Sequence, residues 1–189
     1  AAGFTVAGHL EFGRDVTLPD GSSDRTKTTL ALLPDPDFPR LSFFLCQQHR
    51  PELIYVPEWL EHPNTVNGIK GVTILANAAQ HETLKAKLMS IYGNASPMNG
   101  GFSVQTANGQ ISVQTLDATQ AEFGKLPSDI AQNETPSIVA MDMVYQDAKA
   151  FEAWIATSIM NLKSTASGRY ATQPQDTANV ILRFFDALV

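Results

Sequence analysis

The chain has 189 residues, of which 43% are hydrophobic and 17% charged, and this is enough for one large folded domain or two small ones. A formal net charge of −6 argues against a nucleic-acid partner, because phosphate binding needs clustered Lys and Arg. The single cysteine excludes an intramolecular disulfide framework and a multi-cysteine zinc site, and it favours a reducing, cytoplasmic setting. No apolar stretch approaches the roughly 20 residues that span a bilayer, so no membrane partner is expected.

The first third of the chain predicts strands. Ala1-Ala2-Gly3 is typical of a helix end with its glycine cap, which leads us to expect an upstream segment. A Pro-Asp-Gly turn at 19–21 separates the first predicted strand from the second, and three prolines between 34 and 39 separate the second from the third. The strands are expected at residues 4–12, 25–33 and 41–49. We expect residues 1–66 to form three antiparallel strands of a partial module, followed by a connecting segment.

Two later segments, 67–117 and 137–187, repeat one order of strand, helix, strand and strand. The first has a helix at 79–92 ended by Gly93, and the second has a helix at 147–162 opened by Asp147. The second helix is expected to bury a stripe of apolar side chains, namely Phe151, Trp154, Ile155 and Ile159. A period of about 70 residues indicates internal duplication within residues 67–189, and the mixture of elements indicates an α+β fold.

The stretch 43–64 (FFLCQQHRPELIYVPEWLEHPN) ends an apolar strand in polar groups. Two interpretations stay open. In the first, several side chains close a polar cleft that binds a carbonyl or carboxylate, with Trp59 or Tyr55 as an apolar wall. The candidate polar residues are Gln48, His49, Glu52 and His62. In the second, the same groups form a hydrogen-bond network that holds the Pro51–Trp59 connection.

Three further residues stand out. Cys46 follows Phe43-Phe44-Leu45 and is expected to be a small buried apolar side chain rather than a nucleophile. Asp142 and Arg183 each interrupt an apolar strand of the second repeat. Because an unpaired buried charge is costly, we expect them to form an ion pair in a cleft, either as a structural contact or as an arginine that binds anions.

The sequence resembles glyoxalase-like domain proteins of bacteria, in the vicinal oxygen chelate superfamily. The resemblance rests on Leu18-Pro-Asp-Gly21, Phe44-Leu-Cys-Gln47 with His49, Pro57-Glu-Trp59, His62-Pro-Asn64 and Asn179-Val-Ile-Leu-Arg-Phe184. It implies paired βαβββ modules, with curved mixed sheets and helices on the convex face. It also implies a small oxygenated organic molecule as the ligand.

Metal-dependent members of that superfamily take a His or Gln from the first strand of a module and a Glu from the last strand. By resemblance these positions fall on Gly71, Gln114, Ala140 and Arg183. Glycine and alanine supply no ligand atom, and arginine would repel a metal. We therefore expect no metal or other cofactor. Three functions stay open: an enzyme acting on a small molecule, a non-catalytic binding module, or a module that packs against a homodimer partner or a missing N-terminal module.

Overall fold

The structure, a computed structural model, describes residues 4–132 and 134–187. The glycine cap expected at Gly3 lies outside these residues. The chain forms two compact units, Ala1–His62 and Pro63–Val189, which we call unit 1 and unit 2. The boundary between the units therefore lies after His62, slightly before the boundary after residue 66 that the sequence predicted. Within the described part of the chain, no helix is long and apolar enough to span a membrane.

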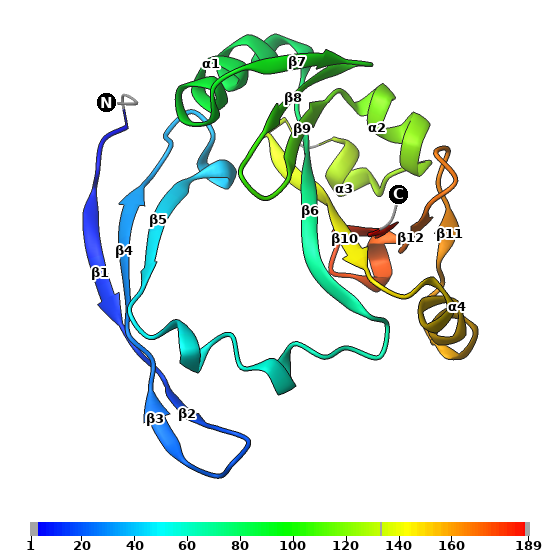
Figure 1. Cartoon of the computed structure of the whole chain (residues 1–189). Coiled ribbons are helices and arrows are strands. Elements are labelled where there is room, and N and C mark those ends of the chain that lie inside the picture. The colour runs from blue at the N-terminus through cyan, green and yellow to red at the C-terminus, as the bar shows by residue number, and fades with distance from the viewer. Residues whose placement is uncertain (1–3, 133, 188–189) are drawn as a thin grey trace. The chain divides into compact units, whose positions relative to one another are not determined.

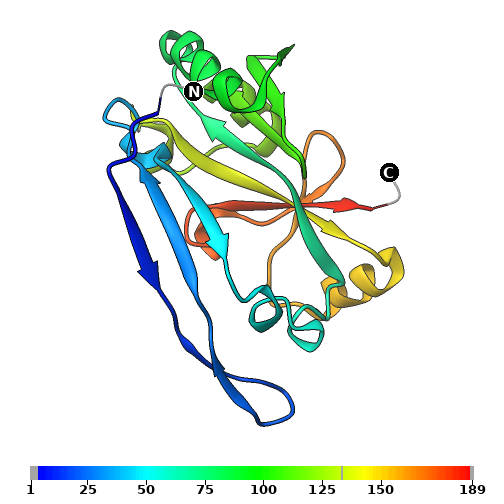
Figure 2. The same cartoon turned by 60° about the vertical axis from the view of Figure 1, so that its left-hand side comes forward.

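Unit 1 contains a three-stranded antiparallel sheet, which confirms the three strands expected from the sequence. The strands are β1 (Gly8–Phe12), β4 (Thr28–Leu33) and β5 (Phe43–Gln48), in the order β1-β4-β5 (Figures 1 and 2). A hairpin of β2 (Asp15–Thr17) and β3 (Ser23–Arg25) surrounds the Pro-Asp-Gly turn, where Gly21 has a φ of 84°. Short 3₁₀ helices begin at prolines, at Pro39–Leu41, Pro51–Leu53 and Pro57–Trp59.

One face of this sheet carries a row of exposed apolar side chains. The strand register places Leu10 beside Leu30, and Leu32 beside Phe44. Leu10 is 48% exposed and Phe44 57% exposed. Cys46 lies beside Leu30 on the same face and is also exposed, so the expectation that it is buried was wrong. The reason is that residues 4–62, the described part of unit 1, form no second layer over this face.

Unit 2 consists of two βαβββ modules joined by a linker. The first module contains β6 (Val66–Leu75), α1 (His81–Tyr92), β7 (Ala95–Met98), β8 (Gly101–Gln105) and β9 (Gln110–Gln114). The second contains β10 (Ser137–Tyr145), α4 (Ala148–Thr157), β11 (Lys163–Ser164), β12 (Tyr170–Ala171) and β13 (Ile181–Asp186). The linker holds α2 (Leu116–Phe123) and α3 (Ser128–Ala131). The repeated order is confirmed. Each module has one more strand (β7 and β11) than the residue pattern predicted, which gives the βαβββ order that the resemblance implied.

All strands of unit 2 form one sheet in the order β11-β12-β13-β10-β6-β9-β8-β7. The antiparallel pair β6 and β10 lies at its middle and joins the two modules (Figure 1). Each of these strands pairs in parallel with the last strand of its own module, β6 with β9 and β10 with β13. The sheet is therefore mixed, as expected.

Helices α1 and α4 pack on one face of the sheet. Phe151 of α4 is fully buried, and its ring stacks on Tyr145 at a centroid distance of 4.1 Å. On α1, Leu84 and Leu88 are buried. Ile159 is fully exposed, so its assignment to the apolar stripe of α4 was wrong, because the helix ends at Thr157 and the next residue is extended.

The linker helices α2 and α3 cover one end of the opposite face, which we call the pocket face. Leu126 and Ile130 bury apolar surface there against Leu75, Ala140 and Ile181 of the sheet. The sequence analysis did not predict these two helices. They leave the rest of the pocket face open to a cavity.

Candidate binding site

The strand register places polar side chains of unit 2 on the pocket face. In the second module, Asp142 lies directly beside Arg183. In the first module, Thr73 lies beside Ser112, and Leu75 beside Gln114. Because side chains alternate along a strand, these positions all point to the same side of the sheet. The sequence pattern of β9, QISVQ, therefore turns its polar positions inward.

The cavity over this face has a volume of about 590 Å³. Its lining combines five charged side chains with neutral polar groups and a few apolar ones. The charged residues are Lys70, Glu122, Asp142, Arg169 and Arg183, and the neutral polar ones include Thr73, Gln105, Gln110, Ser112 and Gln114. All come from unit 2, and one acid, Glu122, comes from the linker helix α2. The cavity thus has the size and polarity of a site for a small molecule.

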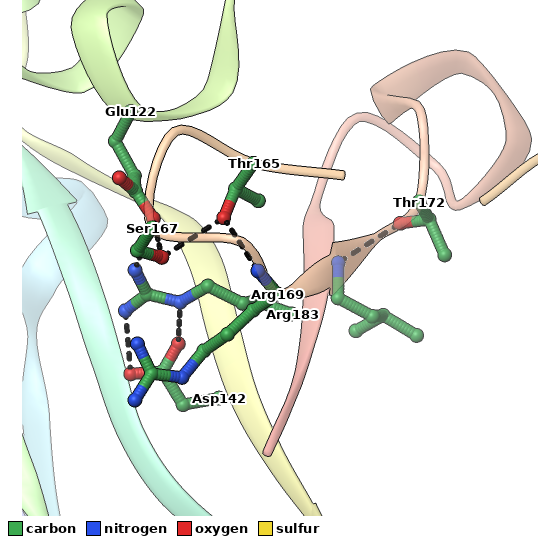
Figure 3. Close-up of polar contacts among 8 residues, drawn as sticks. Glu122, Asp142, Thr165, Ser167, Arg169, Thr172 and Arg183 are labelled. Atoms are coloured by element: carbon green, nitrogen blue, oxygen red, sulfur yellow. Dashed lines mark hydrogen bonds and ion pairs between the residues drawn. The ribbon is translucent and has the colours of Figure 1, made fainter. Parts of the chain in front are cut away.

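Arg183 lies between two carboxylates and bonds to both (Figure 3). Its Nε and one terminal nitrogen donate to the two oxygens of Asp142, at 2.8 and 3.0 Å. The other terminal nitrogen donates to Glu122 Oε1 at 3.0 Å. The side chains of all three residues are less than a fifth exposed. We call Glu122, Asp142 and Arg183 the ion triad.

The contacts within the triad favour the charged forms of Glu122 and Arg183. Burial alone would raise the pKa of Glu122, but hydrogen bonds from Ser167 and Thr165 and the contact with Arg183 together lower the pKa below its usual 4.5. Burial likewise acts to lower the pKa of Arg183, and the bonds to Asp142 and Glu122 raise it instead. Both groups are therefore charged at neutral pH.

A second set of contacts ties α2 to the loop between β11 and β12. Ser167 Oγ donates to Glu122 Oε1 at 2.5 Å and lies 2.9 Å from Thr165 Oγ1. The amide of Ala166 donates to the carbonyl oxygen of Glu122 at 3.1 Å. Figure 3 shows Ser167 and Thr165 following Glu122 in one chain of bonds that reaches the backbone of Arg169. Glu122 is thus held by Arg183 on one side and by the loop between β11 and β12 on the other.

Phe185 is the apolar centre of the charged half of the cavity. The Arg169 guanidinium lies over its ring at 4.3 Å from the centroid, and that of Arg183 at 4.9 Å. Lys70 Nζ is 5.2 Å from the same centroid. Unlike Arg183, the Arg169 guanidinium has no carboxylate partner among the residues that the structure describes, because both acids of the lining already hold Arg183.

A divalent metal, which the resemblance would suggest for this face, does not fit the residues present. A Cβ added to Gly71 would lie 2.7 Å from the carbonyl oxygen of Gln110 and 3.1 Å from Asp142 Oδ2, so no ligand side chain has room there. Ala140 is fully buried and has no donor atom. The two acids are bonded to Arg183, and in the described ranges no three His, Cys, Asp or Glu side chains are grouped so as to hold an ion.

The five candidate ligand residues of the stretch 43–64 lie in unit 1 and bond to different partners. Gln48 accepts from Thr28 Oγ1 at 2.6 Å and donates to Cys46 Sγ at 3.1 Å. His49 Nε2 lies 2.8 Å from Thr29 Oγ1 on the other side of the strand. Glu52 forms an ion pair with Arg50.

Trp59 is 40% exposed and His62 is also exposed. A shallow hollow of unit 1 includes His49 and Glu11 in its lining but none of the other four candidates. The structure therefore does not bring the five residues together around one cavity, and their ligand-binding role stays a prediction.

Sequence reasoning paired Asp142 with Arg183 but missed Glu122. The signals for α2 were present: Thr115 stands before the helix, and Gly124 follows it with a φ of 81°. These residues are typical of helix ends. Recognising them would have placed an acid on a helix next to the expected cleft.

Two βαβββ modules, joined through their first strands and enclosing a polar cavity on one face, define the class of protein. The chain has a glyoxalase-like fold, as the sequence predicted. No protein-family model and no curated protein matches the sequence.

Solved structures give likenesses of fold. A hypothetical protein from Staphylococcus aureus has a TM-score of 0.58 and 9% identity over 97% of this chain, which spans only 57% of that protein's chain. Methylmalonyl-CoA epimerase from Mycobacterium tuberculosis has a TM-score of 0.43 and 13% identity over 65% of this chain and 89% of its own. A mutant of 4-hydroxymandelate synthase from Streptomyces coelicolor has a TM-score of 0.40 and 10% identity, covering 92% of this chain and 62% of its own.

Proposed function

We propose that the cavity of unit 2 binds a small organic molecule that carries a carboxylate, and that it does so without a divalent metal. The observation that carries this proposal is the Arg169 guanidinium in the lining. The two acids of the described lining, Glu122 and Asp142, do not pair with it. Because both acids bond to Arg183, the guanidinium of Arg169 is left to meet a ligand.

The geometry around Phe185 supports a carboxylate as the ligand group. The Arg169 guanidinium lies over the ring, and this contact restricts the guanidinium before any ligand arrives. A planar, pre-ordered guanidinium matches the two oxygens of a carboxylate, which it can bind through two parallel hydrogen bonds. Arg183 is fixed by the triad, in which two carboxylates already balance its charge, so Arg169 is the group that meets the acid of the ligand.

The same contacts favour binding over catalysis. General acid–base chemistry needs a group that can exchange a proton near neutral pH. The described lining contains no His or Cys, and the lowered pKa of Glu122 keeps that carboxylate ionised and bonded to Arg183. A binding or sequestering module is therefore the function that the site supports best.

Thermal-shift measurements test the proposal. A panel of small carboxylates, each compared with the amide of the same skeleton, is titrated against the wild-type chain in the presence of EDTA. We expect some carboxylates to raise the melting temperature and their amides not to do so. Arg169→Gln should weaken carboxylate binding by about 10- to 100-fold, since a charge-assisted contact contributes about 1.5–3 kcal/mol.

The matched control is Lys149→Gln, which removes an exposed charge on α4 outside the lining and should leave affinity unchanged. Arg169→Lys keeps the charge but loses the planar fork, and it should fall between wild type and Arg169→Gln. Equal binding of acids and amides would refute the proposal, as would a requirement for added metal.

A second candidate function, association with another copy of this chain, is favoured by the apolar face of unit 1. Phe12, Leu10 and Phe44 are each about half exposed on one face of the sheet. Such a contiguous apolar row is typical of interaction surfaces, and a two-fold axis can bury it against its own copy. Light scattering after gel filtration should report a dimer, which Phe44→Glu should convert to monomers. A wild-type monomer at high concentration would contradict this candidate.

A further inference from the structure

We infer that the ligand of this cavity is a hydroxylated carboxylate, with a chain of several hydroxyl-bearing carbons attached to its acid group. The inference rests on the proposed function, since it assumes that a carboxylate binds near Arg169. It comes from the other half of the cavity, which the carboxylate does not need. That half is lined by the first module.

The first module contributes neutral hydrogen-bonding groups that the protein itself does not use. The side chains of Thr73, Ser112 and Gln114 all line the cavity. These three side chains have no hydrogen-bond partner among the residues that the structure describes, 4–132 and 134–187. Gln110, by contrast, donates from its amide to Ser103 Oγ at 3.0 Å.

These three groups also have a defined spacing. Thr73 and Ser112 are register partners on adjacent strands, so their backbones are roughly 4.8 Å apart. Gln114 lies two residues further along β9, roughly 6.6 Å from Ser112. A row of hydroxyl groups on a short carbon chain can reach such a set of donors and acceptors together.

Arg183 extends this polar surface into the charged half. A guanidinium has five N–H donors, and the triad uses three of them. The other two can donate to a ligand oxygen that lies between the two halves of the cavity. The surface is therefore polar from Gln114 to Arg169.

An apolar ligand tail would be rejected by this surface. Covering a hydroxyl or amide without replacing its bond to water leaves that group unsatisfied, which is strongly unfavourable. Sites built to bond a substrate hydroxyl discriminate strongly against analogues that lack it. The neutral half thus selects hydroxylated chains, while Arg169 selects the acid.

Calorimetry with three six-carbon probes tests the inference: gluconate, hexanoate and glucitol. Gluconate has both the carboxylate and the hydroxyl groups, hexanoate has only the carboxylate, and glucitol has only the hydroxyl groups. We expect gluconate to bind wild-type protein at least about tenfold more tightly than either of the others, which corresponds to about 1.4 kcal/mol.

Two variants locate the selectivity. Ser112→Ala should reduce the preference for gluconate over hexanoate by about tenfold without weakening hexanoate, and Thr73→Val should act in the same direction. The control Ser90→Ala removes an exposed hydroxyl on α1 and should change neither affinity. Because Thr73 is only 2% exposed, the melting temperature of each variant is measured first, and Ser112→Ala alone suffices if Thr73→Val does not fold.

The outcomes separate the two proposals. If hexanoate binds as tightly as gluconate, or if Ser112→Ala leaves the preference intact, the inference about hydroxyl groups is overturned and the carboxylate proposal stands. If no carboxylate in the panel binds while glucitol does, the proposed function is overturned as well. If none of these probes or the panel acids binds, both are refuted.

Discussion

Replacing Arg183 by methionine should remove the charge that holds the two acids of the triad. Methionine keeps an unbranched side chain of similar reach but cannot donate hydrogen bonds. Asp142 and Glu122, whose side chains are 14% and 19% exposed, would then face each other as unpaired carboxylates. We expect the free energy of unfolding of unit 2 to fall at neutral pH.

The size of the effect follows from the contacts. Three charge-assisted hydrogen bonds of 2.8–3.0 Å are lost, and breaking a buried pair by removing one partner costs about 3–5 kcal/mol. The residual exposure of both acids lets water reach them, so we expect a value near the lower end, about 3 kcal/mol. Adding Asp142→Leu and Glu122→Leu to the same chain should recover most of the loss, because no buried charge then remains.

Urea unfolding followed by tryptophan fluorescence measures this loss. The chain has two tryptophans, so a Trp59→Phe background leaves Trp154, which packs at 5.7 Å from Phe151 in unit 2, as the reporter. Lys149→Met serves as the control, since this charge also lies in unit 2 but is exposed and should contribute little. A loss below about 1 kcal/mol for Arg183→Met would refute the claim that the triad is a buried network.

Three other outcomes are expected. Because the pKa of Glu122 is lowered, its stabilising contacts are complete above about its usual value of 4.5 and are lost as the pH falls through the lowered pKa; Glu122→Gln should flatten the acid limb of the stability curve, measured by urea unfolding from pH 7 to 3. Gly71→Ala should lower stability by about 1–3 kcal/mol through overpacking against Gln110, and a melting curve equal to wild type would contradict the stated lack of space. His49→Ala should change stability by less than about 1 kcal/mol, since its bond to Thr29 is exposed, and a larger loss in urea would favour the structural network at the strand end.

Much of the fold was predictable because the residues that begin and end its helices are recognisable from the local sequence. Gly93 ends α1 with a φ of 89°, and Asp147 caps α4 by accepting from the Ala150 amide at 3.0 Å. Each signal marks the helix of one module, and the order of strands around the helix is the same in both modules, which is why the duplication could be recognised. The strand β11 has only two residues, which is too few to show an alternation of apolar and polar side chains, so it could not be predicted.

The site was less predictable, since the residues that line a polar cavity look like residues that face water. On β9, Gln110, Ser112 and Gln114 alternate with apolar residues as on any half-exposed strand. Only the register with β6 shows that the polar face is the enclosed one. The stretch 43–64 is rich in polar functional groups. Neighbours in sequence alternate between the two faces of the sheet, however, so Gln48 and His49 bond to different threonines.

The antiparallel contact of β6 with β10 has a consequence for how the two modules have diverged. Thr73 is the register partner of Ala140, and Gly71 of Asp142, so an approximate two-fold relation through this contact exchanges Thr73 with Asp142. It likewise exchanges Ser112, beside Thr73, with Arg183, beside Asp142, whereas the sequence analysis had matched Arg183 with Gln114. After duplication, one copy of the same cross-strand position has become an ion pair and the other a pair of hydroxyl groups. Under the proposed function, two identical halves would accept a ligand in either of two equivalent orientations, and we expect the difference between the halves to select one of them.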